Sequence, residues 1–123
     1  MNFETNKYNL EERTGKFGED IIRFCRSINQ DAITKPIISQ LVRLGTSIGA
    51  NYMEADGAES GRDFNHKLSI CKKEAKETMY WLRMVATVEP KQRNECRTLY
   101  QEAKELTLIF SSILLKRKKK STI

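Results

Sequence analysis

Residues 40–82 read QLVRLGTSIGANYMEADGAESGRDFNHKLSICKKEAKETMYWL, and this stretch carries two apolar patterns separated by a polar turn. Leu41 and Leu44 belong to the first pattern, and Phe64 and Leu68 belong to the second. Steps of three and four residues keep side chains on one face of an α-helix, because one turn takes about 3.6 residues. The stretch therefore predicts two amphipathic helices that pack against each other as a hairpin.

The turn of this hairpin is marked by small and polar residues from Gly57 to Gly61. Ser60 and Asp63 have the spacing of a capping box, in which a side chain at the helix start accepts a hydrogen bond from the backbone. We therefore expect the third helix to begin at this point.

The second helix is expected to begin near Pro36, with Thr34 or Lys35 at its cap, because proline suits the first helical turn. Helical spacing also covers residues 10–28 and the residues that follow Pro90. The expected core positions share one face of each helix. They are Leu10, Thr14, Phe17, Ile21, Phe24 and Ile28; Ile37, Leu41, Leu44, Ile48, Asn51, Ala55 and Ala58; Phe64, Leu68, Cys71, Ala75, Thr78, Leu82 and Val85; and Cys96, Leu99, Ala103, Leu106, Phe110 and Ile113.

Four helices joined by short loops predict an all-α protein, an antiparallel up-down-up-down four-helix bundle. We expect residues 1–115 to form this single domain and residues 116–123 to form a basic C-terminal tail that frays. No segment alternates with a period of two, so no strands are expected.

The composition is that of a helical protein without disulfides. Hydrophobic residues make up 39% of the 123 residues and charged residues 31%, which is unlike a disordered chain. Cys25, Cys71 and Cys96 are odd in number and widely spaced, which indicates reduced thiols. The polar start of the chain and the lack of an apolar run of about 18 residues predict a cytoplasmic protein without a membrane partner.

Positive charge is concentrated at the C-terminus. The formal net charge is +6, and five of the 22 basic residues are consecutive: Lys116, Arg117, Lys118, Lys119 and Lys120. The other 17 basic residues nearly balance the 16 acidic residues, so no broad nucleic-acid-binding face is expected on the bundle itself. The tail is the expected phosphate-contacting segment, and a solvated tail without a ligand is the alternative.

Residues suited to catalysis or metal binding are sparse. His66 is the single histidine, which excludes a di-iron bundle built on two Glu-x-x-His motifs. The three cysteines lie on expected core faces, where a thiol behaves as a small apolar group. We therefore expect no catalytic residue, no metal, no cofactor and no small-molecule substrate.

Polar residues follow one another beside the apolar face of the second helix: Arg43, Ser47, Asn51 and Glu54. Equal counting outward from the turn places Arg43 within reach of Glu74 or Glu77 on the third helix. We expect these six residues to form a buried polar seam in which Arg43 pairs with one of the two carboxylates, because a buried charge requires a partner. A binding pocket at the same place is the alternative.

Gly45 and Gly49 lie inside the second helix, where each costs about 1 kcal/mol relative to alanine. This cost predicts the close approach of another helix, either within the bundle or from a second subunit. Large apolar residues away from the core faces also predict self-association. The expected subunit interface consists of Val42, Gly45, Gly49, Ile70, Trp81 and Met84.

The hairpin stretch also resembles a family pattern. The matching residues are Gln40, Leu41, Arg43, Ser47, Ile48, Ala50, Asn51, Glu54, Ser60 and Phe64, followed by Glu74 and Glu77. They are similar to those of the small four-helix-bundle proteins found in intervening sequences of bacterial 23S ribosomal RNA genes. One departure is Ala55, where the commoner pattern has a glycine after the glutamate.

This resemblance implies a four-helix bundle that assembles into a homopentamer. It also implies kinship to the accessory protein of diversity-generating retroelements, a basic pentameric barrel associated with nucleic acid and reverse transcriptase. The expected function is that of a non-enzymatic oligomeric bundle that contacts RNA or DNA through the phosphate backbone. A purely structural or protein-interaction module that binds no nucleic acid is the alternative.

Overall fold

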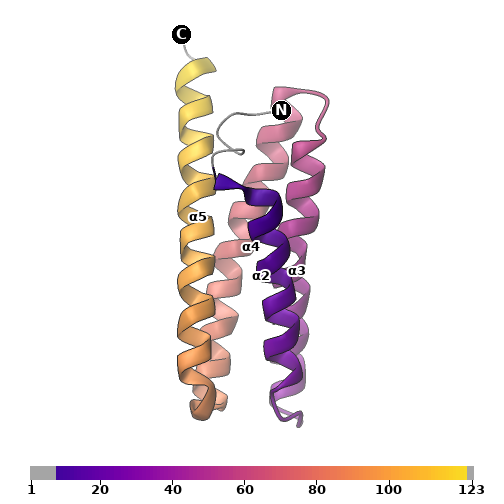
Figure 1. Cartoon of the computed structure of the whole chain (residues 1–123), viewed down its shortest axis with the longest axis vertical. Helices are drawn as coiled ribbons and strands as arrows, with labels where there is room; N and C mark the ends of the chain where they lie inside the picture. The colour runs from indigo at the N-terminus through magenta and orange to yellow at the C-terminus, as the bar shows by residue number, and fades with distance from the viewer. Residues whose placement is uncertain (1–7, 122–123) are drawn as a thin grey trace.

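The computed structural model describes residues 8–121, which form an antiparallel bundle of helices (Figure 1). The helices are α2, Leu10–Arg26; α3, Thr34–Asp56; α4, Gly61–Val88; and α5, Arg93–Ser121; a short 3-10 helix, η1 (Pro90–Gln92), joins α4 to α5. Consecutive helices pack side by side and α2 also touches α5, whereas the diagonal pairs make no contact within residues 8–121. The predicted all-α, up-down-up-down bundle is confirmed.

The start of α4 follows its predicted cap. Ser60 Oγ accepts a hydrogen bond from the backbone N–H of Asp63 at 3.1 Å, and the helix begins at the next residue, Gly61. The start of α5 is later than predicted, because Pro90 begins η1 and the α-helix begins only at Arg93.

The start of α3 lies earlier than predicted. Asp31 Oδ1 accepts hydrogen bonds from the backbone N–H groups of Ile33 and Thr34, at 2.8 and 2.9 Å. Asp31, rather than Thr34 or Lys35, therefore satisfies the free donors of this helix end. Pro36 still lies in the first turn, where its missing N–H is not needed.

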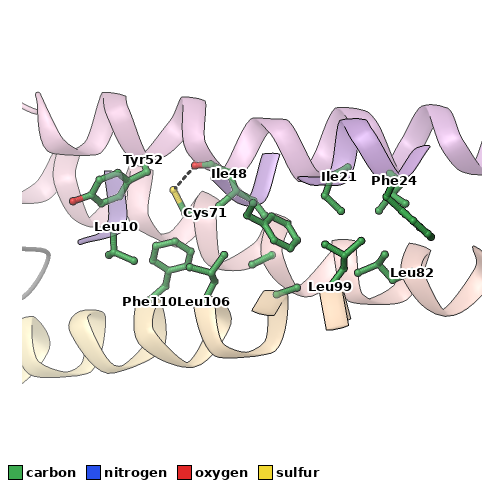
Figure 2. Packing of buried hydrophobic residues seen from close by; sticks show 14 of the residues in the cluster. Leu10, Ile21, Phe24, Ile48, Tyr52, Cys71, Leu82, Leu99, Leu106 and Phe110 are labelled. Atoms are coloured by element: carbon green, nitrogen blue, oxygen red, sulfur yellow. Dashed lines mark hydrogen bonds between the residues drawn. The ribbon is translucent and has the colours of Figure 1, made fainter. Parts of the chain in front are cut away.

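The core is one apolar strip along the bundle axis (Figure 2). Every core position expected on α2, α4 and α5, together with Ile28 just after α2, is buried. On α3, Leu41, Leu44, Ile48 and Ala55 are buried as predicted, but Ile37 and Asn51 are half-buried and Ile38 and Tyr52 are buried instead. Ala58, which follows α3, is also half-buried.

The register of the α3–α4 hairpin matches equal counting from the turn. The Cys71 thiol lies 3.6 Å from the backbone oxygen of Ile48, and it donates to that oxygen within the core (Figure 2). Both residues are fully buried. The two apolar patterns of residues 40–82 therefore face each other as expected.

The helices α2 and α3 approach each other closely at their glycines. A Cβ atom added to Gly45 would lie 2.9 Å from two side-chain carbons of Ile21, and one added to Gly49 would lie 3.3 Å from the backbone oxygen of Thr14. Gly18 of α2 faces α3 in the same way. Contact within the bundle, and not with a second subunit, therefore accounts for the two glycines of α3.

The basic C-terminal residues are helical. Helix α5 continues through Ser121 and so includes the part of the predicted tail that the structure describes. This end of α5 lies at the same end of the bundle as the α3–α4 turn (Figure 1). Residues 1–7 and 122–123, which belong to the predicted domain and tail, lie outside the described residues. None of the helices in the described range has the length and apolar character that a membrane span requires.

Candidate nucleic-acid interface

Basic side chains of α4 follow its junction with α5. Lys72, Lys76 and Arg83 recur at helical spacing, and Met79 lies on the same flank of the helix. The hydroxyl of Thr107 on α5 lies 3.9 Å from the sulfur of Met79, which shows that this flank faces α5. Lys76 and Arg83 are exposed, and Lys72 is half-buried.

Basic side chains of α5 border the same junction. Arg93, Arg97 and Lys104 are exposed, with Tyr100 between the last two. Arg93, Arg97 and Tyr100 line a hollow together with Arg83 of α4, so the two helices contribute to one surface. We call the surface formed by Lys72, Lys76, Arg83, Arg93, Arg97 and Lys104 the α4–α5 groove.

The acidic residues of these two helices lie on the opposite flanks. On α4, Glu74 is turned toward α3, where it accepts a hydrogen bond from Asn51 at 2.8 Å. On α5, Glu102 and Glu105 are turned toward α2, where both bind Arg13. The fold therefore separates positive from negative charge across α4 and α5.

None of the basic side chains of the α4–α5 groove has an ion-pair partner among residues 8–121. The ion pairs of the described residues lie on α2, between α2 and α5, and between Lys67 and Glu54 of the α3–α4 hairpin. None of them includes a residue of the groove. The near-neutral body of the bundle therefore still carries these six basic side chains along the α4–α5 junction.

The groove residues were not predicted from the sequence, because only the net charge and the run of consecutive basic residues were considered. The usable signal was their spacing: Lys72, Lys76 and Arg83, and again Arg93, Arg97 and Lys104, recur at steps close to whole helical turns. Such spacing places each set on one side of a helix. It does not tell which neighbouring helix that side meets.

One end of the groove deepens into a pocket of about 400 Å³. The lining residues are Leu82, Arg83, Ala86, Arg93, Cys96, Arg97 and Tyr100. Leu82 and Cys96 are buried, and burial raises the pKa of the Cys96 thiol to about 11, so the thiol is neutral at pH 7. The pocket therefore combines an apolar floor with a cationic rim.

Arg117 is held against the start of α4. Its Nε donates a hydrogen bond to Asn65 Oδ1, its Nη2 donates to the backbone oxygen of Gly61 at 3.5 Å, and its guanidinium lies 4.6 Å from the centre of the Phe64 ring. An open pocket of about 520 Å³ at this end of the bundle is lined by Gly61, Arg62, Asn65, Arg117 and Lys120. Arg117 thus anchors α5, whereas Lys116, Lys118, Lys119 and Lys120 are exposed.

The predicted polar seam is a partly exposed strip between α3 and α4. Arg43 is exposed and donates to Gln40 Oε1 at 2.8 Å, so its predicted ion pair with Glu74 or Glu77 is absent from the described residues. Because Arg43 is exposed, water solvates its charge, and the carboxylate partner that a buried arginine would need is not required. Asn51 binds Glu74 instead.

The other members of this strip have local partners. Ser47 Oγ donates to the backbone oxygen of Arg43 at 2.6 Å, and Lys67 pairs with Glu54 at 2.8 Å. Trp81 Nε1 donates to Glu77 at 3.5 Å.

The residues predicted for the subunit interface lie on two different sides of the bundle. Val42 is half-buried on the side of α3 that carries Gly45, which α2 covers. Ile70, Trp81 and Met84 are half-buried on the flank of α4 that carries Glu74 and faces α3. The six residues therefore do not form one continuous patch.

The cysteines and the histidine are separate from one another. Cys25, Cys71 and Cys96 are free and buried, and burial raises the pKa of Cys25 and Cys71 to about 12. His66 is exposed near the start of α4. Over residues 8–121, no group of three or more His, Cys, Asp or Glu side chains is arranged to hold a metal ion.

Comparison with known proteins points to one family. A family model described as 23S rRNA-intervening sequence protein matches residues 6–112 of the chain. Among solved structures, the chain is similar to a protein of unknown function from the S23 ribosomal protein family of Bacteroides thetaiotaomicron, with 30% sequence identity and a TM-score of 0.76. That similarity covers 85% of this chain and 97% of the other. No curated protein matches the chain.

Proposed function

Because this chain belongs to the 23S rRNA-intervening sequence protein family, we propose that it is a non-enzymatic oligomeric bundle that contacts RNA or DNA through the phosphate backbone. The observation that carries this proposal is the α4–α5 groove, whose basic side chains form no ion pair with any described residue. Phosphates supply the missing negative charge, and the release of their counterions supplies affinity.

The dimensions of the groove suit a nucleic-acid strand. Lys72 and Arg83 are separated by about 16 Å along α4, at about 1.5 Å per residue, and Arg93 and Lys104 by the same distance along α5. Phosphates in one strand of B-DNA follow each other at about 3.4 Å along the axis. The groove thus spans about five base-pair steps measured along the axis of B-DNA. The exposed lysines near the end of α5 add positive charge at the other end of the bundle.

Assembly is the second part of the proposal, with a homopentamer as the form that the family resemblance implies. Ile70, Trp81 and Met84 lie on one side of the bundle and Val42 on another, and Met53 on α3 is 65% exposed. A closed ring joins two different faces of each subunit, because every contact in it is heterologous. The parts of these apolar side chains that the bundle leaves uncovered, Met53 above all, support such a contact.

The phosphate proposal is tested by binding of fluorescently labelled RNA and DNA oligonucleotides over a range of salt concentrations. The test variant replaces Lys76, Arg83 and Lys104 by glutamine. The matched control replaces three exposed basic residues outside the groove, Arg26, Lys35 and Arg43, and so changes the net charge equally.

Wild-type affinity is expected to fall steeply with salt. Each lost phosphate contact reduces the slope of log K against log salt by about 0.7–0.9, so the groove variant should lose about two units of slope and the control variant much less. Absent or salt-insensitive binding by the wild-type protein would overturn the proposal in favour of a structural or protein-interaction module. Equal losses in both variants would show that the groove is not the site.

A further inference from the structure

The pocket at the end of the α4–α5 groove differs from the rest of the groove in having an aromatic wall and an apolar floor. Tyr100 is 38% exposed, whereas Leu82 and Cys96 beneath the groove are buried. Ala86 and Cys96 have small side chains, which leave a hollow between the two helices at this point. The hollow measures about 400 Å³, within the range of about 300–1,000 Å³ that is typical of small-ligand sites.

The rim of this pocket is positively charged, in contrast to its apolar floor. Arg83 comes from α4, and Arg93 and Arg97 come from α5, so three guanidinium groups border one apolar hollow. Among residues 8–121, no acidic side chain lines the pocket and none of the three arginines forms an ion pair. A ligand that fits this arrangement has a flat apolar part and a strongly anionic part.

From the juxtaposition of Tyr100 with Arg83, Arg93 and Arg97, we infer that this pocket binds one nucleotide of a single-stranded nucleic acid. The base lies on the Tyr100 ring over the apolar floor, and the flanking phosphates contact the arginines. The inference rests on the proposed function and adds a substrate class to it. Phosphate contacts alone would suit a duplex equally well, but the bases of a duplex are stacked inside it and cannot reach an aromatic wall.

The probes for the experiment are labelled 12-mers: single-stranded RNA, single-stranded DNA, the corresponding DNA duplex, and a DNA single strand of abasic sites. The abasic strand keeps the phosphates and lacks the bases. The variants are Tyr100→Leu, which keeps an apolar side chain without a ring, and Tyr100→Phe, which keeps the ring. Tyr80→Leu is the matched control, because Tyr80 is 51% exposed on α4 and does not line the pocket.

We expect the wild-type protein to bind the base-containing single strand about 5- to 100-fold more tightly than the abasic strand, the range for one stacked base. Tyr100→Leu should lose this preference and retain abasic binding, whereas Tyr100→Phe and Tyr80→Leu should keep it. The RNA and DNA strands then show which sugar is preferred.

The outcomes separate the two proposals. Salt-dependent binding with equal affinity for abasic and base-containing strands, or for the duplex and the single strand, overturns the nucleotide pocket and leaves the phosphate-binding groove in place. The absence of salt-dependent binding to every probe overturns the groove itself. A Tyr100→Leu variant that retains the preference also overturns the pocket, provided that its circular dichroism shows an intact bundle.

Discussion

The side chain of Ile21 on α2 fills the space in which a side chain at Gly45 of α3 would lie. A Cβ atom added to Gly45 would be 2.9 Å from two carbon atoms of Ile21, closer than carbon atoms normally approach. The two helices come this close because residue 45 has no side chain. The lack of a side chain at Gly45 thus allows α2, the shortest of the four described α-helices, to pack closely against α3.

Gly45→Ala is therefore expected to destabilise the protein. Overpacking costs about 1–3 kcal/mol, and the better helix propensity of alanine offsets about 1 kcal/mol of it. Gly15→Ala is the matched control, since no atom lies within 4 Å of a Cβ added to Gly15 in α2. The control should be stabilised by up to about 1 kcal/mol. Urea unfolding followed by circular dichroism measures both, and changes of the same sign would contradict the packing argument.

Glu74 is expected to make stability depend on pH. Burial raises the pKa of its carboxyl group, although the hydrogen bond from Asn51 and the charge of Arg43 act in the opposite direction. The folded state therefore binds the proton more tightly than the unfolded state does. The stability that Glu74 contributes is present below its unfolded pKa and is lost as the pH rises through its folded pKa.

Glu74→Gln should accordingly unfold at higher urea concentration than the wild type near pH 7, because glutamine avoids the cost of a partly buried negative charge. The difference in urea midpoint between the two proteins should narrow as the pH falls through the raised pKa of Glu74, where the wild-type carboxyl group takes up its proton. Urea titrations of both proteins at several pH values measure this difference in urea midpoint. A difference that grows toward acid pH would show that the sign is wrong.

Arg13 is expected to couple α2 to α5. Its Nε and Nη2 donate to the two carboxylate oxygens of Glu102 at 2.9 and 2.8 Å, and both side chains are about 30% exposed. A double-mutant cycle with Arg13→Met and Glu102→Met should give a coupling of about 0.5–1 kcal/mol that decreases with salt. The exposed pair of Lys16 and Asp20 within α2 should give a smaller coupling, because solvent screens it more strongly. The prediction fails if the couplings of the two pairs are equal.

Arg117 is expected to hold the last turns of α5 in place. Its contacts with Asn65 and the Phe64 ring are lost in Arg117→Ala, so amide hydrogen exchange near the end of α5 should become faster. Lys116→Ala removes the same charge from an exposed position and should leave the exchange rates nearly unchanged. Hydrogen exchange followed by mass spectrometry compares the two variants, and similar acceleration in both would contradict the anchoring role.

Self-association is expected to depend on the apolar side of α4. The wild-type protein should scatter light as an oligomer at tens of micromolar, and Met84→Glu should shift it toward the monomer by placing a charge at the contact. Lys73→Glu is the control, because Lys73 is exposed. A wild-type protein that remains monomeric at this concentration would refute the assembly proposal.

Much of the candidate site escaped prediction because it depends on which flanks of the helices meet. The tail residues Lys116 to Lys120 were recognisable as consecutive charges, but Arg83 and Arg97 are isolated in the sequence and meet only across the α4–α5 junction. Arg43 was predicted beside Glu74 from a correct hairpin register, yet it binds Gln40. The register of the hairpin fixes which backbone positions of the two helices lie opposite each other. A long exposed side chain can still bond to any of several groups within its reach.

The sequence by itself determined the helices and most of their buried faces. Apolar spacing such as Leu68, Cys71 and Ala75 specifies a helical period, and burial of that face is what stabilises an amphipathic helix. Only the tertiary structure decided that α2 fits against Gly45 and that the positive charges of α4 and α5 share a groove. The physical reason is that a helical period defines an inner and an outer side, while close approach and charge separation depend on which helices are neighbours.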